Sequence, residues 1–526
     1  MTSATTTGFV GRAEELQRLL GLLDRAERGR PAVGLIAGDA GVGKTRLLDE
    51  LAARAEGRGV RVLVGGCMEV GDVGLPYVPF VDALRDLGTR PGEAEVAAPL
   101  AAALPSLGRL LPELATDHGP PPPPGDGFER VQLFDGVLSL LVRLSELSPL
   151  LLVIEDLHWA DRSTRDLLAF LVRTLRGGRV ALVASYRSDE LHRRHPLRPL
   201  LAELVRLPAV ERLELAPFTR AELDEHLEAI AGAPLSPDRL EDILARSEGN
   251  PFYAEQLLAA GAADARVELP ATLAEVLLAR VQGLSEPAQR VLRVAAVVGR
   301  RVPHRLLAGV AGQPEAELEE GLKEAVSARV LTADAATGSY AFRHALLQEA
   351  VYGDLLPGEQ VRLHAACARL LAVEPGGAAA ELAHHCLASH DLVGALAASV
   401  RAAEEAEAVL APAEGLRHLA NALRLWERVP EPAAAAGVDR VELTLRAAAT
   451  ASAAGDPQRA ASLAQDAARD AAETTDPERA ARAYERLGLY LFVAGRVEEA
   501  LAARTRAVEL VPAQPPTRLR ARVTAA

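Results

Sequence analysis

The sequence predicts an α/β domain with a parallel sheet, followed by a mostly helical region. Four short apolar runs, at residues 33–37, 60–64, 150–154 and 180–185, alternate with segments of helical periodicity. Strands that alternate with helices form a parallel sheet covered on both faces. Beyond about residue 216 we expect no further buried strand, apart from one hairpin at 329–343. From about residue 376 the chain becomes rich in alanine, which favours helices.

The amino-acid composition and the net charge exclude several classes of protein. The 526 residues carry 58 basic and 72 acidic side chains, and the net charge of −14 disfavours general binding to nucleic acid or to an anionic membrane. No segment approaches the ~18 uninterrupted apolar residues that span a bilayer, and the first residues do not have the pattern of a signal peptide. The three cysteines form no C-x-x-C pair and no disulfide framework. We therefore expect a cytoplasmic protein that makes no contact with a membrane.

The helices of the α/β domain are predicted from the spacing of leucines. Residues 13–28, 128–147 and 163–176 each carry apolar side chains at helical intervals. Residues 91–127 are weakly periodic and contain five consecutive prolines, at 120–124, which cannot continue a helix. We interpret this segment as a surface insertion.

The C-terminal part contains a repeat of tetratricopeptide type. In the unit at residues 481–514, positions 4, 7, 8, 11, 20, 27 and 32 follow that spacing, with small residues where two helices touch. These positions hold Tyr484, Leu487, Gly488, Leu491, Ala500, Ala507 and Pro512. Position 24 is usually aromatic and is Arg504 here. A second unit lies 40 residues earlier and a third around residues 382–402, although any alanine-rich helical stretch also satisfies the small-residue positions.

A glycine-rich loop follows the first predicted strand and matches the pattern G-x-x-x-x-G-K-[ST]. It consists of Gly38, Asp39, Ala40, Gly41, Val42, Gly43, Lys44 and Thr45. The glycines let backbone N–H groups face phosphates, the Lys44 ammonium reaches the β- and γ-phosphates, and the Thr45 hydroxyl can ligate Mg²⁺. The chain has only one other lysine, Lys323. A lysine retained here argues against a chance match, because the site needs a compact ammonium.

Two acids end the third predicted strand, 111 residues after Lys44. Glu155 and Asp156 follow the apolar run at 150–154. One carboxylate can hold Mg²⁺ and the next can orient the attacking water. We assign both to catalysis, with Glu155 and Thr45 as metal ligands and Asp156 as the residue that orients water. The alternative is a polar cap on the end of a strand.

Arg187 follows the fourth predicted strand. Its cation could contact the γ-phosphate and report hydrolysis, or it could be one of many surface arginines in an arginine-rich chain. His158 and Trp159 lie just beyond the acidic pair, and we expect them to pack locally without a chemical role.

These motifs resemble those of a known family. The chain resembles the N-terminal part of the large ATP-binding LuxR-family (LAL-type) regulators, which belong to the STAND branch of the AAA+ P-loop NTPases. The matching segments are Phe9–Arg12, Gly38–Thr45 (Walker A), Leu151–Asp161 (Walker B region), Leu215–Phe218 (the proline motif of the lid), Glu248–Phe252 (the closing motif of the lid) and Phe342–Leu347. The resemblance covers most of the chain.

The resemblance implies a domain order and a set of nucleotide contacts. It implies a P-loop ATPase core at 8–215, a helical lid at 216–265, a winged-helix-like domain at 270–360 and a tetratricopeptide-like α-solenoid at 361–526 that is apparently incomplete. It implies ATP or ADP with Mg²⁺. Beyond the P-loop it places Val10 and Arg12 against the adenine, Pro217 in the lid and His344 as a nucleotide-sensing histidine.

Two features depart from the family pattern. Glu155 stands where P-loop ATPases more often have aspartate, and the longer side chain could shift the metal contact or slow hydrolysis. No basic helix-turn-helix segment follows Pro512. We therefore expect no sequence-specific DNA binding by this chain, and an uncovered repeat face that self-associates or binds a partner.

The expected function is a slowly hydrolysing ATP switch of transcriptional-regulator type, with a small-molecule or protein inducer at the repeats. Two alternatives stay open at the level of sequence. One is a helical scaffold whose nucleotide is purely structural. The other is a transcription factor that binds DNA through the winged helix.

Overall fold

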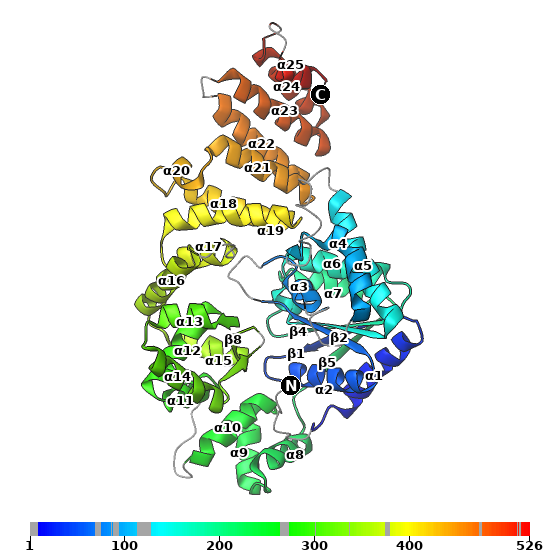
Figure 1. Ribbon diagram of the computed structural model, residues 1–526, viewed down its shortest axis with the longest axis vertical. Helices are drawn as coiled ribbons and strands as arrows, with labels where there is room; N and C mark the ends of the chain where they lie inside the picture. The colour runs from blue at the N-terminus through cyan, green and yellow to red at the C-terminus, as the bar shows by residue number, and fades with distance from the viewer. Residues whose placement is uncertain are drawn as a thin grey trace.

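The computed structural model describes residues 9–525, except 69–74, 86, 88–93, 113–127, 264–272, 300, 336, 374–378, 473–475, 513 and 515–516. The predicted proline run at 120–124 lies outside the described residues, as do the limits at 265 and 270 between the predicted lid and winged-helix domains. The α/β domain lies beside a small mixed domain, three short helices join the two, and a helical arm extends away toward the C-terminus (Figure 1).

A five-stranded parallel sheet forms the centre of the α/β domain. The strands run in the order β2-β3-β4-β1-β5. Their bounds are β1 Ala32–Gly38, β2 Arg61–Gly66, β3 Leu150–Glu155, β4 Val180–Arg187 and β5 Val210–Leu215. The four predicted strands are confirmed, and β5 is a strand that the prediction missed.

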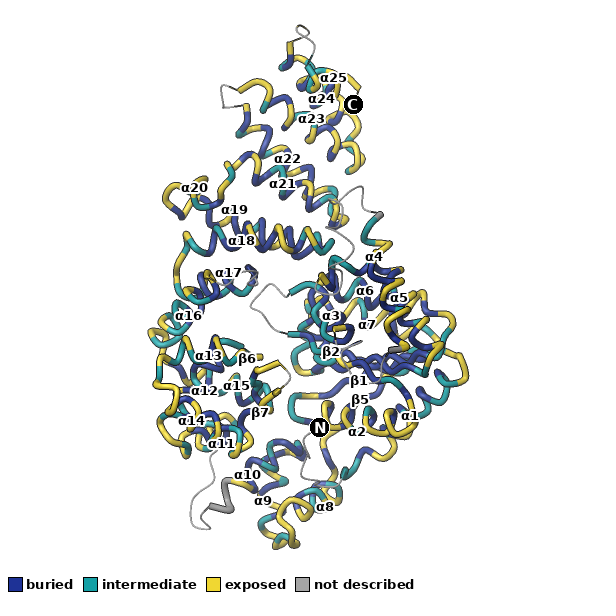
Figure 2. Tube along the Cα trace, in the orientation of Figure 1, coloured by how far each residue is buried: buried dark blue, intermediate teal, exposed yellow. Residues whose placement is uncertain are grey.

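Helices cover both faces of this sheet, which explains why its strands β1 and β4 are buried along their whole length (Figure 2). In β3, Leu151 and Val153 join the core beneath α1 and α2, while Leu150, Leu152 and Ile154 join the core on the opposite face. The surrounding helices are α1 Ala13–Glu27, α2 Lys44–Gly57, α3 Val78–Arg85, α4 Ala97–Leu107, α5 Phe128–Leu147, α6 Arg162–Thr174 and α7 Leu197–Leu204. The helices expected at 13–28, 128–147 and 163–176 are thereby confirmed.

Three short helices follow β5. They are α8 Arg220–Ala231, α9 Pro237–Ser247 and α10 Pro251–Ala263. Thr219 begins α8 with a capping box, in which its side chain and that of Glu222 each bind the backbone of the other. This group has its own apolar core, centred on Leu223, Leu227 and Ile243.

A small mixed domain comes next. It contains α11 Leu273–Gln282, α12 Glu286–Val298, α13 His304–Ala311, α14 Glu315–Ser327 and α15 Ala345–Asp354, with β6 Arg301–Pro303, β7 Leu331–Asp334 and β8 Ser339–Phe342. The hairpin predicted at 329–343 is confirmed as β7 and β8, and β6 adds an unpredicted third antiparallel strand. The winged-helix interpretation of this unit stays a prediction.

Helices stack in pairs through the remaining chain. They are α16 Pro357–Leu371, α17 Ala379–Ala388, α18 Leu392–Ala408, α19 Pro412–Trp426, α20 Pro432–Ala436, α21 Arg440–Ala453, α22 Pro457–Ala472, α23 Pro477–Val493, α24 Val497–Leu510 and α25 Arg518–Ala525. The unit predicted at 481–514 corresponds to α23 and α24. A Cβ on Gly488 would lie 2.6 Å from the Arg504 side chain and 3.2 Å from the Ala500 carbonyl, so only glycine lets these helices approach. Arg504 occupies the position at which the repeat usually has an aromatic residue. Its guanidinium lies over the Phe492 ring, 5.7 Å from the ring centre.

The helical arm packs directly on the α/β domain at the start of α6. Glu414 of α19 is fully buried and accepts hydrogen bonds from the N–H groups of Arg162, at 2.8 Å, and Ser163, at 3.3 Å. Asp161 caps the same helix through the Thr164 N–H, at 2.8 Å. Burial, together with the nearby Glu414 charge, raises the pKa of Asp161. The arm is thus anchored on α6, which begins a few residues after Glu155 and Asp156.

Within the described part of the chain, no helix combines the length and the apolar character needed to cross a membrane.

Candidate functional site

The glycine-rich loop turns from β1 into α2 as predicted. Gly41 and Gly43 have φ values of 79° and 100°, a region that residues with a side chain rarely adopt. The loop ends where α2 begins at Lys44, and the first turn of that helix has no acidic residue to compete with an anion. Backbone N–H groups and the positive end of a helix therefore meet at one place, as a phosphate site requires.

Lys44 is buried in this loop. Its Nζ donates hydrogen bonds to the carbonyl oxygens of Gly38 and Asp39, both at 2.7 Å. Burial lowers the pKa of Lys44 to about 8, and the Arg187 charge acts in the same direction. The negative charge of Asp156 opposes that shift more strongly than any other neighbour does. Lys44, Asp156 and Arg187 therefore lie close enough to influence one another's charge.

Thr45 and Glu155 lie together, although 110 positions separate them. The Thr45 hydroxyl donates to Glu155 Oε2 at 3.0 Å. A hydroxyl beside a carboxylate is a set of oxygen ligands that suits Mg²⁺. The donor set thus fits Mg²⁺ bound with a nucleoside triphosphate.

Asp156 has a left-handed backbone conformation, with φ at 57°. Its N–H group donates to the buried Ser185 hydroxyl of β4 at 3.2 Å. The prediction missed Ser185, although its place near the end of a strand beside β3 would have suggested it. Strain of this kind is common at functional sites, and here it fixes the chain directly after Glu155.

Arg187 lies at the end of β4, as predicted, but its guanidinium is committed to other groups. It pairs with Glu190 and with Glu349 of α15, the latter at 3.2 Å, and it stacks on Trp159 at 5.0 Å from the ring centre. The backbone N–H of Arg187 also donates to His158 Nδ1 at 3.3 Å. His158 and Trp159 pack locally, as expected, and both contact Arg187. Contact between Arg187 and a γ-phosphate stays a prediction.

Arg12 joins three segments. One terminal nitrogen of its buried guanidinium donates to the Val42 carbonyl at 3.3 Å and to the Ala216 carbonyl, and the other binds Glu15 at 3.1 Å. The guanidinium also lies 4.9 Å from the centre of the Phe218 ring. The predicted N-terminal motif therefore contacts the P-loop and the start of the lid.

Val10 and Pro217 belong to these joined segments. Val10 is half-buried and Pro217 is exposed, close to Gly249 of the closing motif. No observation on either side chain tests its predicted contact with a nucleotide.

The segment predicted to be the closing motif of the lid contacts the P-loop. Asn250 donates through its side-chain nitrogen to the Ala40 carbonyl at 2.8 Å, and the Phe252 N–H donates to the Gly41 carbonyl at 3.4 Å. The Ser188 hydroxyl donates to Asp39 Oδ1 at 3.1 Å. The prediction named the motif around Asn250 without this contact, and it did not include Ser188. The available signal for Ser188 was its position as a polar residue directly after β4, a strand whose end forms part of the site.

His344 directly precedes α15. One residue, Phe252, connects it in space to the P-loop. Its ring packs on Phe252, with ring centres 4.2 Å apart. Burial lowers the pKa of His344 to about 4, so the ring is neutral at pH 7. The structure thus places His344 against the lid residue that binds Gly41. A direct contact with a phosphate stays a prediction.

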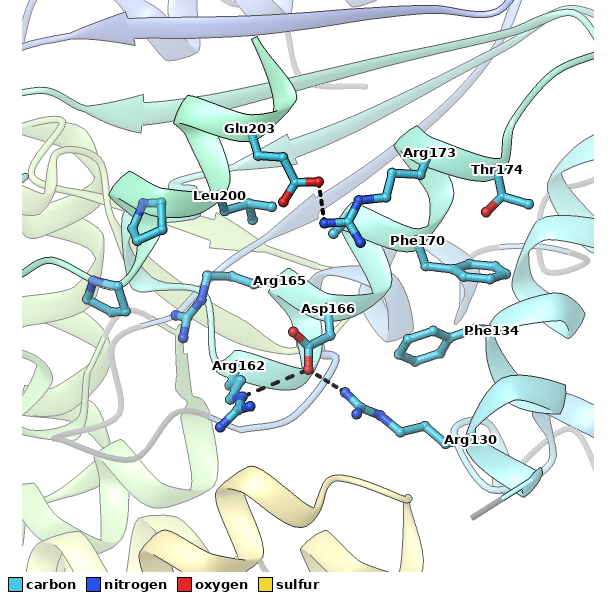
Figure 3. A pocket seen from close by; sticks show the side chains of 13 residues that line it. Arg130, Phe134, Arg162, Arg165, Asp166, Phe170, Arg173, Thr174, Leu200 and Glu203 are labelled. Carbon is cyan, nitrogen blue, oxygen red and sulfur yellow. Dashed lines mark hydrogen bonds and ion pairs between the residues drawn. The ribbon is translucent and has the colours of Figure 1, made fainter. Parts of the chain in front are cut away.

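Figure 3 shows a cavity of about 750 Å³ that lies away from these residues, between α5, α6 and α7. Arginines from α5 and α6 surround it. Asp166 accepts from Arg130 at 2.6 Å, and Glu203 pairs with Arg173. No residue of the predicted nucleotide site lines this cavity.

The geometry agrees with the comparison to known families. Residues 8–183 match the family model described as AAA ATPase domain. A match to an AAA ATPase domain implies nucleotide binding, typically with Mg²⁺. The boundaries of the match enclose β1 to β3, the first half of β4, the P-loop and both Glu155 and Asp156.

Similar proteins extend the comparison beyond the AAA domain. An uncharacterized protein of Rhizobium meliloti (strain 1021) is 26% identical over 481 residues, covering 83% of this chain. This chain spans 44% of the length of that relative. Among solved structures, a STAND protein with a tetratricopeptide repeat sensor from Pyrococcus horikoshii aligns over 98% of this chain and 79% of its own, with 13% identity and a TM-score of 0.45. The Aeropyrum pernix ORC1 protein, solved in complex with DNA, aligns over 66% of this chain and 94% of its own, with 19% identity and a TM-score of 0.29.

Nucleotide affinity should depend on pH through Lys44. With its pKa lowered to about 8 in the free protein, Lys44 loses its charge as the pH rises above 8. Bound phosphates favour the charged form, so binding above pH 8 requires the uptake of a proton. The Kd for ADP should then rise by up to ~tenfold per pH unit above 8, and Lys44 should cause no change below pH 7. Fluorescence titrations with labelled ADP from pH 6.5 to 9.5 would measure this, and a flat profile would contradict it.

Replacement of His344 by alanine should speed the release of ADP. The imidazole packs on Phe252, which binds Gly41 of the P-loop, so its loss should loosen the lid over the nucleotide. Stopped-flow displacement of labelled ADP would measure the dissociation rate. A core histidine without a sensing role would instead lower the melting temperature equally with and without ADP, and that result would contradict the sensor assignment.

Proposed function

We propose that this chain is an ATP-binding, slowly hydrolysing signalling switch of the STAND class, of the type found in LuxR-family transcriptional regulators. ATP or ADP would bind between the sheet and the lid. The state of the nucleotide would then set the position of the small mixed domain and the helical arm. An inducer, either a small molecule or a protein, would act on the helical repeats.

One observation supports a switch above all. Helix α15 lies outside the AAA domain, yet it meets the nucleotide site at two points. Glu349 pairs with Arg187 at 3.2 Å, and His344 packs on Phe252 of the lid. A γ-phosphate that attracted Arg187 would compete with Glu349 for the same cation. Hydrolysis would therefore change the force that holds α15 against the AAA domain, which is how a local charge biases a two-state element.

The residues of the candidate site have distinct roles in this proposal. Backbone N–H groups of the P-loop and Lys44 would hold the β- and γ-phosphates. Thr45 and Glu155 would hold Mg²⁺, which neutralises charge on the phosphates when bound. Asp156 would orient the attacking water. Slow turnover agrees with Glu155 in place of an aspartate and with an arginine already bound to two carboxylates.

A second contact supports signalling from the repeats. Glu414 of α19 binds the start of α6, which follows Glu155 and Asp156 by a few residues. A ligand that displaced α19 would leave the α6 N–H groups and the Asp161 carboxylate in a changed environment. The helical arm is thereby attached close to the hydrolytic residues and can influence them.

Nucleotide analysis and single-turnover hydrolysis test the proposal together. The purified full chain should contain bound adenine nucleotide, and excess protein should convert ATP to ADP in one slow phase. Limited proteolysis of the full chain should then proceed at different rates in the ATP and ADP states. Bound nucleotide with no hydrolysis and identical cleavage would instead indicate a helical scaffold with a structural nucleotide.

A further inference from the structure

Three histidines gather where the small mixed domain meets the first repeat. His364 belongs to α16, and His384 and His385 are adjacent on α17. One ring nitrogen from each lies within 4.8 Å of the other two. His364 and His385 are buried, with 1% and 3% of their surface exposed, whereas His384 is only partly buried. The cluster is therefore reached by solvent from the side of His384.

The two buried rings face each other. Their Nδ1 atoms are 2.7 Å apart and share a hydrogen bond, in which one ring donates and the other accepts. Burial lowers the pKa of His364 to about 4 and that of His385 to about 3, so both rings are neutral at pH 7. Neutral imidazole is the form that binds metals. The proposed nucleotide switch makes no use of these rings.

A tyrosine orients the cluster from behind. The Tyr352 hydroxyl hydrogen-bonds with His364 Nε2 at 3.1 Å. This contact occupies the outer nitrogen of the ring and directs Nδ1 toward His385. Histidine ligands of metals usually make such a bond through the nitrogen that does not bind the ion, because it fixes the tautomer and the ring orientation.

We propose that His364, His384 and His385 form a binding site for a divalent transition-metal ion of the zinc class. Imidazole nitrogens favour Zn²⁺, Cu²⁺, Ni²⁺ and Co²⁺ over Mg²⁺ and Ca²⁺. A tetrahedral ion with bonds of ~2.0–2.1 Å would hold the nitrogens ~3.3 Å apart. The buried pair must separate slightly and His384 must approach slightly, both within the range of side-chain rotation. The ring that donates the hydrogen bond between His364 and His385 moves that proton from its Nδ1 to its own Nε2 as the metal bonds form, so both rings stay neutral, and water fills the remaining position.

The location gives the ion a structural consequence. Tyr352 lies near the end of α15, and His344 precedes the start of the same helix. The metal site and the lid contact are thus at opposite ends of one ten-residue helix. A bound ion would tie α16 to α17 and, through Tyr352, to α15. The metal proposal itself stands on the three rings and does not depend on ATP hydrolysis.

Cobalt titration of the untagged, metal-depleted full chain tests the site. Excess Mg²⁺ occupies any oxygen-ligand site at Thr45 and Glu155, so added Co²⁺ reports on the histidines. We expect the intense visible bands of four-coordinate Co²⁺, saturation at an equimolar ratio, and loss of the bands when Zn²⁺ is added. A titration without these bands would overturn the proposal.

Three variants and a matched control complete the test. His385→Ala and His384→Ala should each weaken Co²⁺ binding by more than ~100-fold, and Tyr352→Phe by ~10-fold, as removal of outer hydrogen bonds does elsewhere. His384 is only partly buried, so its variant keeps the test valid if His385→Ala fails to fold. Exposed His390→Ala, in the turn after α17, should bind like wild type. Equal affinity in wild type and His384→Ala, or equal loss in His390→Ala, would overturn the site. ADP binding checks the fold of each variant.

Discussion

Lys44→Ala should weaken the binding of ATP and ADP by at least ~100-fold. A hydrogen bond to a charged group contributes about 1.5–3 kcal/mol, and the Lys44 ammonium would face more than one phosphate oxygen. The side chain is buried and its ammonium already lies against the P-loop carbonyls of Gly38 and Asp39. Alanine would leave those carbonyls without a donor as well as removing the charge. Calorimetric titration with ADP and with ATP would measure the loss.

The chain offers a matched control for this substitution. Lys323 is its only other lysine, and it is exposed on α14, where it pairs with Glu319 at 3.0 Å. Lys323→Ala removes the same charge from the protein at a site far from the loop, and it should leave nucleotide affinity unchanged. Equal affinity of Lys44→Ala and wild type would contradict the assignment of the phosphate site. A parallel loss in Lys323→Ala would point to a general electrostatic effect instead.

The parts of the site that could be predicted are those that a short segment of sequence determines. The P-loop needs particular residues at fixed spacing, so it can be recognised at residues 38–45 from the sequence alone. The run at 150–154 is apolar because β3 is buried on both faces, and its two acids mark its carboxyl end. The contact of Thr45 with Glu155 then follows from the sheet, because parallel strands bring their carboxyl ends to one edge.

The edge strand was missed for a physical reason. Among the described strands β5 pairs only with β1, and its last four residues alternate between exposed and buried positions. Its sequence, VERLEL, therefore lacks the apolar run that identified the other four strands. Alternation over so few residues is a weak signal, and the glutamates and arginine reduce it further.

Contacts between domains could not be predicted from local patterns. Glu349 is 162 positions from Arg187, and Glu414 is 251 positions from Ser163. Each glutamate lies in a helix whose apolar periodicity predicts only that the side chain is on the solvent-exposed face. It does not predict a partner for that side chain. Only the packing of whole units decides that Glu414 is buried at the start of α6. The same holds for His364, which meets His385 through the packing of α16 against α17.

Asp156→Asn should retain ATP binding and lose ~10²–10⁴-fold in the rate of hydrolysis. That range is typical when a residue that handles the proton in the transition state is lost. The substitution keeps the size of the side chain, and asparagine tolerates the left-handed backbone conformation seen at Asp156. The hydrogen bond from the backbone N–H of residue 156 to Ser185 should therefore survive. A lower rate of hydrolysis would then report on the loss of the Asp156 carboxylate. Single-turnover assays with Mg·ATP would measure the rate, and calorimetry would measure binding.

Glu155→Gln separates the two acids. Glu155 accepts from Thr45 at 3.0 Å, which places it with the metal ligands, so this variant should require more Mg²⁺ for half-maximal ATP binding. Asp156→Asn should leave that Mg²⁺ requirement close to wild type. If Glu155→Gln abolishes hydrolysis at saturating Mg²⁺ while Asp156→Asn still hydrolyses ATP, the two roles are reversed. The longer arm of Glu155 would then reach the water, and the strained backbone at Asp156 would serve to hold it there.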